Sequence, residues 1–134
     1  MDINWFDEFA VNVAEMDGQH VKIFALIGRL RRGVEEKNER AAVEEVLLDL
    51  LDYTQKHFSR EEQIMKEHEY PNLAKHKAEH SWLLAEVLDR KKKFEQEGNL
   101  KATELGAFLY NWLKDHIAIT DKEYGKFLNS RGIQ

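Results

Sequence analysis

Cysteine is absent from the 134 residues of the chain. Without thiols the chain has neither a disulfide framework nor a thiolate metal site. Any metal must therefore be bound by imidazole and carboxylate groups, and these ligands leave the hard and borderline metals as candidates.

Long apolar runs and an excess of basic side chains are missing too. No segment approaches the roughly 18 uninterrupted apolar residues that a membrane-spanning helix needs, and the early acidic residues Asp2, Asp7 and Glu8 do not fit a secretory signal peptide. The formal charge of -5 argues against sequence-independent nucleic-acid binding, which depends on a basic surface. We therefore expect one cytoplasmic domain over residues 1–134, with no membrane insertion and no nucleic-acid partner.

Helix-breaking residues are scarce, since the chain has one proline, Pro71, and seven scattered glycines. Between the breaks, apolar side chains recur at steps of three and four, which is the period of an amphipathic helix. The predicted helices span about 18–37, 39–67, 73–96 and 100–127. Asn38 and Asn72 are expected to be N-caps. Short connections favour an all-α, up-down-up-down antiparallel four-helix bundle, with residues 1–16 as an N-terminal arm.

Five of the six histidines fall within the apolar stripes of these helices. They are His20, His57, His76, His80 and His116. One histidine on a core face is usually a satisfied core residue, because a buried imidazole needs a polar partner. Five together indicate more, and the i, i+4 pairs His57 with Glu61 and His76 with His80 each lie on one helix face. The combination predicts a metal site in the bundle core.

Asp121 follows His116 by a spacing of i, i+5, which a regular α-helix rotates by about 140°. Both side chains can face the core only if the backbone departs from regular geometry. We predict a π-type bulge or a loosened turn near Thr120, because such bulges occur often at functional sites. Regular helical bonding through Tyr124, with Asp121 facing solvent, would contradict this prediction.

Two further polar residues lie next to these motifs. Glu62 is either a surface carboxylate or an acceptor for a histidine N–H, and the sequence leaves both roles open. His68 precedes the Tyr70-Pro71 turn, where we expect it to cap the helix or face solvent.

These motifs together resemble the hemerythrin family, above all its single-domain bacterial members. The matching segments are Asp17-Gly18-Gln19-His20, His57-Phe58-Ser59-Arg60-Glu61-Glu62, Tyr70-Pro71 before His76-Lys77-Ala78-Glu79-His80, and Trp112-Leu113-Lys114-Asp115-His116-Ile117 with Asp121. The similarity runs from Trp5 to the end of the fourth helix. All seven ligand positions of the family pattern are occupied in order.

The resemblance implies a non-haem di-iron centre, with two iron ions in the Fe2+ or Fe3+ state and a bridging oxo or hydroxo group. The implied ligands are His76, His80 and His116 on one iron, His20 and His57 on the other, and Glu61 and Asp121 bridging both. The second iron then has one donor fewer, which leaves a position open for O2. The implied lining of the oxygen pocket is Ile23, Phe24, Phe58, Trp112, Leu113 and Ile117.

The function implied by the resemblance is reversible oxygen binding for storage, delivery or buffering, and not catalysis. Enzymatic di-iron bundles use carboxylate-rich sites with Glu-x-x-His pairs, and the chain contains no such pair. Two alternatives stay open. One is a sensor of oxygen, nitric oxide or redox state that acts through a separate partner, and the other is a di-iron enzyme that consumes peroxide or nitric oxide. The sequence does not identify a protein recipient of oxygen, and we expect a monomer.

Overall fold

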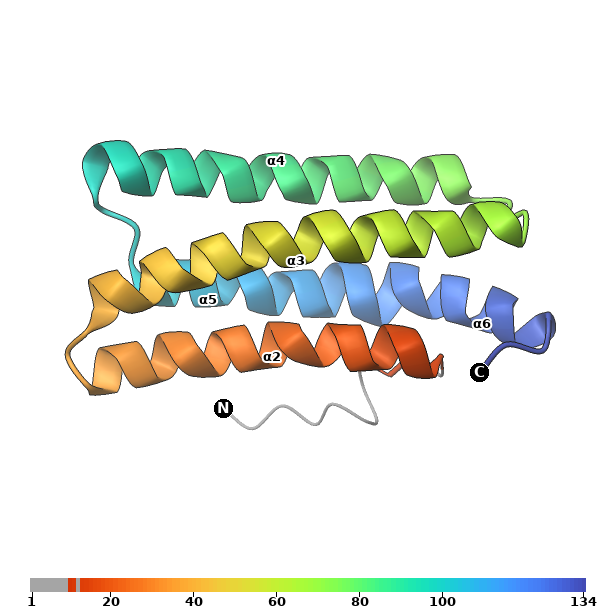
Figure 1. The fold of residues 1–134 in the computed structure, drawn as a ribbon, viewed down its shortest axis with the longest axis horizontal. Coiled ribbons are helices and arrows are strands. Elements are labelled where there is room, and N and C mark those ends of the chain that lie inside the picture. The colour runs from red at the N-terminus through yellow and green to blue at the C-terminus, as the bar shows by residue number, and fades with distance from the viewer. Residues whose placement is uncertain (1–9, 12) are drawn as a thin grey trace.

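The computed structural model describes residues 10–11 and 13–134, whose helices run side by side along one long axis (Figure 1). In chain order they are α2 (Ala14–Glu35), α3 (Glu39–Glu67), α4 (Leu73–Glu97), α5 (Ala102–Asn111), the π-helix η1 (Trp112–Asp121) and α6 (Lys122–Ser130). The last three follow one another without a break and form the fourth rod of the bundle. Successive rods run in opposite directions (Figure 1), so the predicted antiparallel four-helix bundle is confirmed. Among the described residues, no helix is both long and apolar enough to cross a membrane.

The helix ends differ from the predicted ones in the first and last rods. α2 begins at Ala14, so residues 14–16, which the sequence assigns to the arm, are already helical. Met16 in this first turn is fully buried and ties the turn to the core. The rest of the predicted arm lies mostly outside the described residues. The fourth rod runs from Ala102 to Ser130 and not over 100–127.

The two predicted N-caps occupy their expected places without acting as side-chain caps. Asn38 precedes α3 and Asn72 precedes α4. Within the described part of the chain, neither side chain makes a capping hydrogen bond. His68 is the C-cap residue of α3, in agreement with the role expected for it.

The apolar stripes of all four rods meet in one core. Fully buried members include Ile23 of α2, Leu47 and Leu50 of α3, Val87 of α4, and Leu105 and Leu109 of α5. The regular helical period places Ile119 on the inner face too, but its side chain is 60% exposed. The reason is that Ile119 lies in η1, where the π-helical winding changes the direction in which each later side chain points.

Helices α2 and α3 approach each other closely at Gly33. A Cβ atom added there would lie 2.3 Å from the Cβ of Ala42, a distance that requires the backbones to move apart. We expect Gly33→Ala to lower the free energy of unfolding by about 1–3 kcal/mol, as overpacking does. Gly18 of the same helix is the matched control, because none of the described atoms lies within 4 Å of its added Cβ.

Gly18→Ala should instead stabilise the chain by roughly 0.5–1 kcal/mol, because alanine favours the helix over glycine. Urea unfolding of both variants measures the two effects. Midpoints that shift in the same direction by the same amount would contradict the close approach at Gly33.

Candidate metal centre

All seven predicted ligands lie together in the core. His20 comes from α2, His57 and Glu61 from α3, His76 and His80 from α4, and His116 and Asp121 from η1. Each of these residues is at most 3% exposed. Burial of so many polar groups is costly unless they satisfy one another or bind an ion, so the cluster is a candidate metal centre.

The seven side chains form two overlapping groups. One group is Glu61, His76, His80, His116 and Asp121, and the other is His20, His57, Glu61 and Asp121. Within each group, one ligand atom from every residue lies within 4.8 Å of the others. The two carboxylates belong to both groups, whereas the histidines divide three to two.

Each oxygen of Glu61 faces a different group of histidines. Oε1 lies 2.6 Å from Nε2 of His76 and 3.0 Å from Nε2 of His80. Oε2 lies 3.3 Å from Nε2 of His57 and 3.8 Å from Nε2 of His20. The carboxylate therefore spans the two groups.

Asp121 spans the groups in the same way. Its Oδ1 lies 2.9 Å from Nε2 of His76 and 3.2 Å from Nε2 of His116. Its Oδ2 lies 3.2 Å from Nε2 of His20. Two carboxylates that each present one oxygen to either side have the arrangement needed to bridge a pair of cations.

Whether the buried polar atoms have hydrogen-bond partners shows whether a metal fits this site. Several have no hydrogen-bond partner among residues 10–11 and 13–134, namely Oε2 of Glu61, both carboxylate oxygens of Asp121, and Nε2 of His80 and His116. Unsatisfied buried polar atoms are costly, and these lie at the centre of the cluster. Imidazole nitrogen with carboxylate oxygen is a donor set that suits iron, so the residues fit a metal pair.

The charges of the cluster are strongly coupled. Burial alone would lower the pKa of His20, but the nearby carboxylates of Asp121 and Glu61 outweigh burial and raise the pKa to about 9. The same balance raises the pKa of His76 to about 9 and that of His116 to about 10. Burial would raise the pKa of Glu61, but the four surrounding histidines hold it well below its ordinary value. Without metal, protonated histidine rings therefore balance the negative charges of the two carboxylates.

The π-helix η1 explains how His116 and Asp121 both reach the site. π-helical winding takes more residues per turn than an α-helix, which brings i, i+5 side chains toward the same face. Asp121 is fully buried among the histidines and does not face solvent. The predicted departure from regular geometry is confirmed, although it extends over 10 residues and is not limited to one turn near Thr120.

A second layer of acceptors lies behind the histidines. Nδ1 of His80 lies 2.8 Å from Oε2 of Glu62, which places Glu62 as an acceptor for a histidine N–H. Nδ1 of His116 lies 3.4 Å from Oε1 of Glu79, and this oxygen also accepts a 3.0 Å hydrogen bond from the hydroxyl of Thr120. Such acceptors fix the orientation of a ligand ring.

Gln19 belongs to the same layer as Glu79, because its Oε1 is hydrogen-bonded to Nδ1 of His57. Neither residue stands out as a candidate in the sequence alone. A signal was present, because each directly precedes a predicted ligand, His80 or His20. A helix turns by about 100° per residue, so the neighbour of an inward ligand points toward the adjacent helix.

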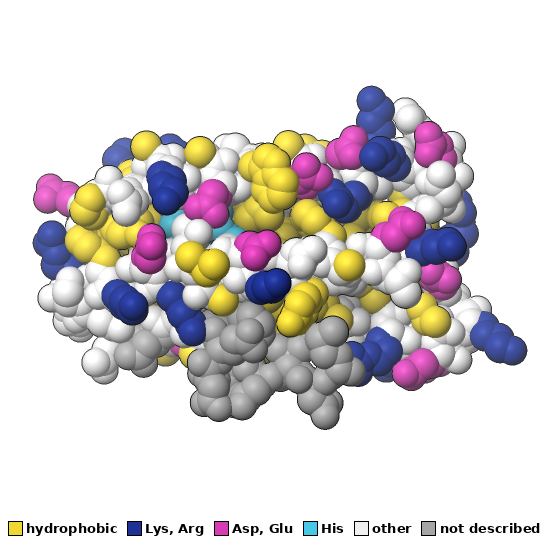
Figure 2. All heavy atoms as spheres, turned by 180° about the vertical axis from the view of Figure 1, so that it is seen from behind, with side chains coloured by type: hydrophobic (Ala, Val, Ile, Leu, Met, Phe, Trp, Pro, Cys, Tyr) yellow, Lys and Arg dark blue, Asp and Glu magenta, His cyan; other side chains and the backbone are white. Residues whose placement is uncertain are grey.

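Of the residues predicted to line an oxygen pocket, Phe58 packs against the histidines of the cluster, and Trp112 lies beside Phe58. Ile23, Phe58, Trp112, Leu113 and Ile117 are buried and Phe24 is half-buried. The ring of Phe58 stacks on His80 with centroids 3.9 Å apart and lies 5.6 Å from the ring of Trp112. Histidine is only just visible on the face of the molecule in Figure 2. The ring of Phe58 therefore covers the ring of His80 with an apolar surface.

Known proteins are similar to this chain in sequence and in fold. The family model for the hemerythrin HHE cation binding domain matches residues 11–128. The bacteriohemerythrin of Methylococcus capsulatus is 37% identical over 126 residues, which are 92% of this chain and 93% of that protein. The bacteriohemerythrin of Stenotrophomonas maltophilia is 34% identical over 120 residues, 90% of this chain and 77% of that protein. A crystal structure of wild-type hemerythrin superposes with a TM-score of 0.80 at 34% identity, covering 96% of this chain and 97% of that one. The chain therefore belongs to the hemerythrin family.

Proposed function

We propose that this protein binds molecular oxygen reversibly at a di-iron centre held by the seven buried side chains. The observation that carries the proposal is the orientation of Glu61 and Asp121, each of which turns one oxygen to either group of histidines. With both carboxylates shared, the group with His20 and His57 has one donor fewer. An open position of this kind separates a reactive metal site from a structural one.

The protein's own residues favour carriage of oxygen over its activation. The bound irons would supply the electrons for oxygen binding. Five neutral imidazoles with only two carboxylates give fewer anionic ligands than enzymatic di-iron bundles provide, which disfavours the highest iron oxidation states. The packing of Phe58 on His80 and Trp112 limits the access of water and protons to the site.

Oxygen storage, delivery or buffering follows from such binding. We assign no enzymatic activity to the chain, and the bacteriohemerythrin relatives support this assignment by their similarity over at least 90% of its length. The seven side chains would hold the irons, and a solvent-derived oxo or hydroxo group would complete the proposed centre.

The test is an optical titration of the protein reconstituted with Fe2+ without oxygen. The reduced protein should bind two irons per chain and develop a visible charge-transfer band in air. Flushing with argon should remove the band, and several cycles should repeat it. Irreversible oxidation would overturn carriage in favour of sensing, and rapid consumption of peroxide or nitric oxide would favour an enzyme. A chain that binds no iron would overturn the di-iron centre itself.

A further inference from the structure

The histidines of the two groups are backed by groups of different charge. On the three-histidine side, Nδ1 of His80 and Nδ1 of His116 face the carboxylates of Glu62 and Glu79. On the two-histidine side, Nδ1 of His57 donates to the neutral amide oxygen of Gln19. A carboxylate behind an imidazole makes the ring a more electron-rich ligand than an amide does. The two ends of the site therefore differ in electron donation.

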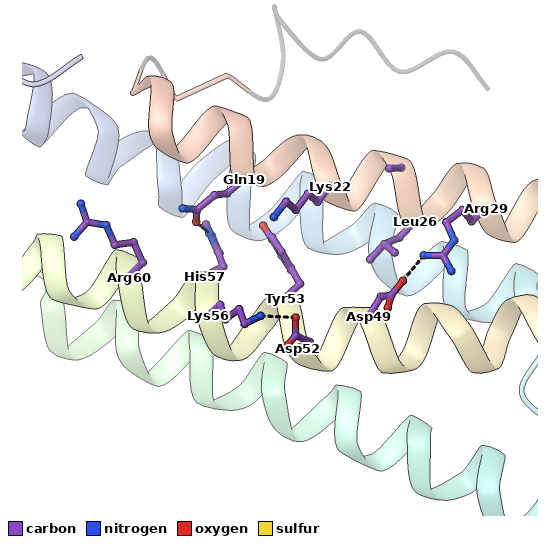
Figure 3. Close-up of a pocket in the computed structure, with 11 residues that line it drawn as sticks. Gln19, Lys22, Leu26, Arg29, Asp49, Asp52, Tyr53, Lys56, His57 and Arg60 are labelled. Carbon is purple, nitrogen blue, oxygen red and sulfur yellow. Dashed lines mark hydrogen bonds and ion pairs between the residues drawn. The ribbon is translucent and has the colours of Figure 1, made fainter.

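The two grooves that flank the site also differ in the charge of the residues that line them. The groove between α2 and α3, which Gln19 and His57 line (Figure 3), carries Lys22, Arg29, Lys56 and Arg60 against Asp49 and Asp52. The groove between α4 and the fourth rod, which His116 lines, carries Glu79, Glu86, Glu104 and Asp115 against Lys75 and Arg90. Salt screens these exposed charges, so they add to the direct contacts at the histidines but do not replace them.

Gln19 also holds the ring of His57 in place. Figure 3 shows its side chain reaching from α2 to His57 on α3. On its other side, His57 stacks nearly parallel to Tyr53, with ring centroids 5.0 Å apart and an interplanar angle of 8°. When the proton of the neutral His57 ring is on Nδ1, the Nε2 atom that faces Glu61 carries none. Orientation is thus achieved without a negative charge.

We propose that Gln19 is a positioning residue that orients His57 without adding a negative charge behind it. As a result, the metal at the His20–His57 end keeps its lower charge state more easily than the metal at the three-histidine end does. The inference rests on the proposed di-iron centre. Iron at the His20–His57 end, where the open position lies, would therefore remain ferrous more easily than iron at the other end. Glu62 and Glu79 do the opposite for the three-histidine end.

A pair of isosteric exchanges tests this inference. Gln19→Glu keeps the acceptor oxygen and adds a negative charge behind His57, whereas Glu62→Gln keeps the acceptor and removes a charge behind His80. Redox titration of the iron-loaded variants should show Gln19→Glu lowering the midpoint potential and Glu62→Gln raising it. We expect each ferric-to-ferrous ratio at fixed potential to change about tenfold, which is about 59 mV for a one-electron couple.

Zinc binding supplies a readout without redox chemistry. Titration of the metal-free chain with Zn2+ should show the weaker of two sites tightening about tenfold in Gln19→Glu. The matched control is Gln63→Glu, which adds the same charge to the exposed face of α3, where Gln63 bonds to Arg60 and Glu67. The control should leave both affinities and the potential unchanged.

Two results separate the failure of this inference from that of the proposed function. If iron assembles and the two exchanges shift the potential in the same direction, or leave it unchanged, Gln19 has no such role. If the unaltered chain assembles no di-iron centre, the proposed function fails, and the zinc titration still decides whether Gln19 controls donation by His57.

Discussion

Glu61→Gln should leave the chain unable to hold two metal ions. The two oxygens of Glu61 face Nε2 atoms of different histidine groups, at 2.6 Å from His76 and 3.3 Å from His57. Glutamine has nearly the same shape, but it is neutral and turns an NH2 group toward one of the two sides. Iron per chain after reconstitution and gel filtration should fall from two to one or fewer.

Glu67→Gln is the control for this exchange. Glu67 lies on the same helix, is exposed, and accepts a 3.2 Å hydrogen bond from Gln63. This variant should bind iron as the unaltered chain does. Because loss of one partner from a buried ion pair costs about 3–5 kcal/mol, circular dichroism must establish that metal-free Glu61→Gln is folded. Two irons per chain in a folded Glu61→Gln would refute the bridging role.

The fold and the seven candidate ligands follow from the spacing of residues in the sequence. Apolar residues at steps of three and four fix which face of each helix is buried, and the histidines lie on those faces. His57 with Glu61 and His76 with His80 are related by one turn of a single helix, so local geometry alone places each pair together. In these cases the helix period determines the neighbours directly.

The acceptors behind the histidines could not be predicted from the helix period, because their contacts join different helices. Gln19 meets His57 across 38 residues, and Glu79 meets Thr120 across 41. Which polar side chains meet there depends on the rotation and axial offset of neighbouring helices, and the period of one helix does not define these. The carboxylates behind His80 and His116 and the amide behind His57 therefore emerge only from the assembled bundle.

The length of η1 could not be predicted from the spacing of residues either. The i, i+5 spacing of His116 and Asp121 requires some departure from α-helical geometry, but one bulge would satisfy it. The structure extends π-helical bonding over Trp112–Asp121. The buried side chains of Trp112, Leu113 and Ile117 pack along this stretch, so core packing and the position of Asp121 are satisfied together.

Metal loading should release about three protons from the chain at pH 7, because metals bind neutral imidazole. In the metal-free chain the pKa values of His20 and His76 are raised to about 9 and that of His116 to about 10. These three rings are therefore protonated at neutral pH. Calorimetric titration with Zn2+ in two buffers of different ionisation enthalpy counts the protons. Loading without proton release would show that the rings are neutral before metal binds.

The same pKa shifts make the stability of the metal-free chain depend on pH differently from that of the metal-loaded chain. A raised histidine pKa stabilises the metal-free fold fully below the ordinary value of 6.5, and this contribution is lost as the pH rises through 9 to 10. The lowered pKa of Glu61 stabilises the fold above its ordinary value of 4.5, and this is lost in acid. The metal-free chain should therefore be most stable between about pH 4.5 and 6.5.

Bound metal should increasingly offset this loss as the pH rises, because protons compete less for the imidazoles. At a free metal concentration a thousand times the dissociation constant, binding stabilises the fold by about 4 kcal/mol. Thermal unfolding with excess metal or with chelator, from pH 5 to 10, should show the gap between the two curves widening with pH. A gap that stays constant would mean that protons and metal do not share the same buried ligands, and the seven residues would then not be the metal site.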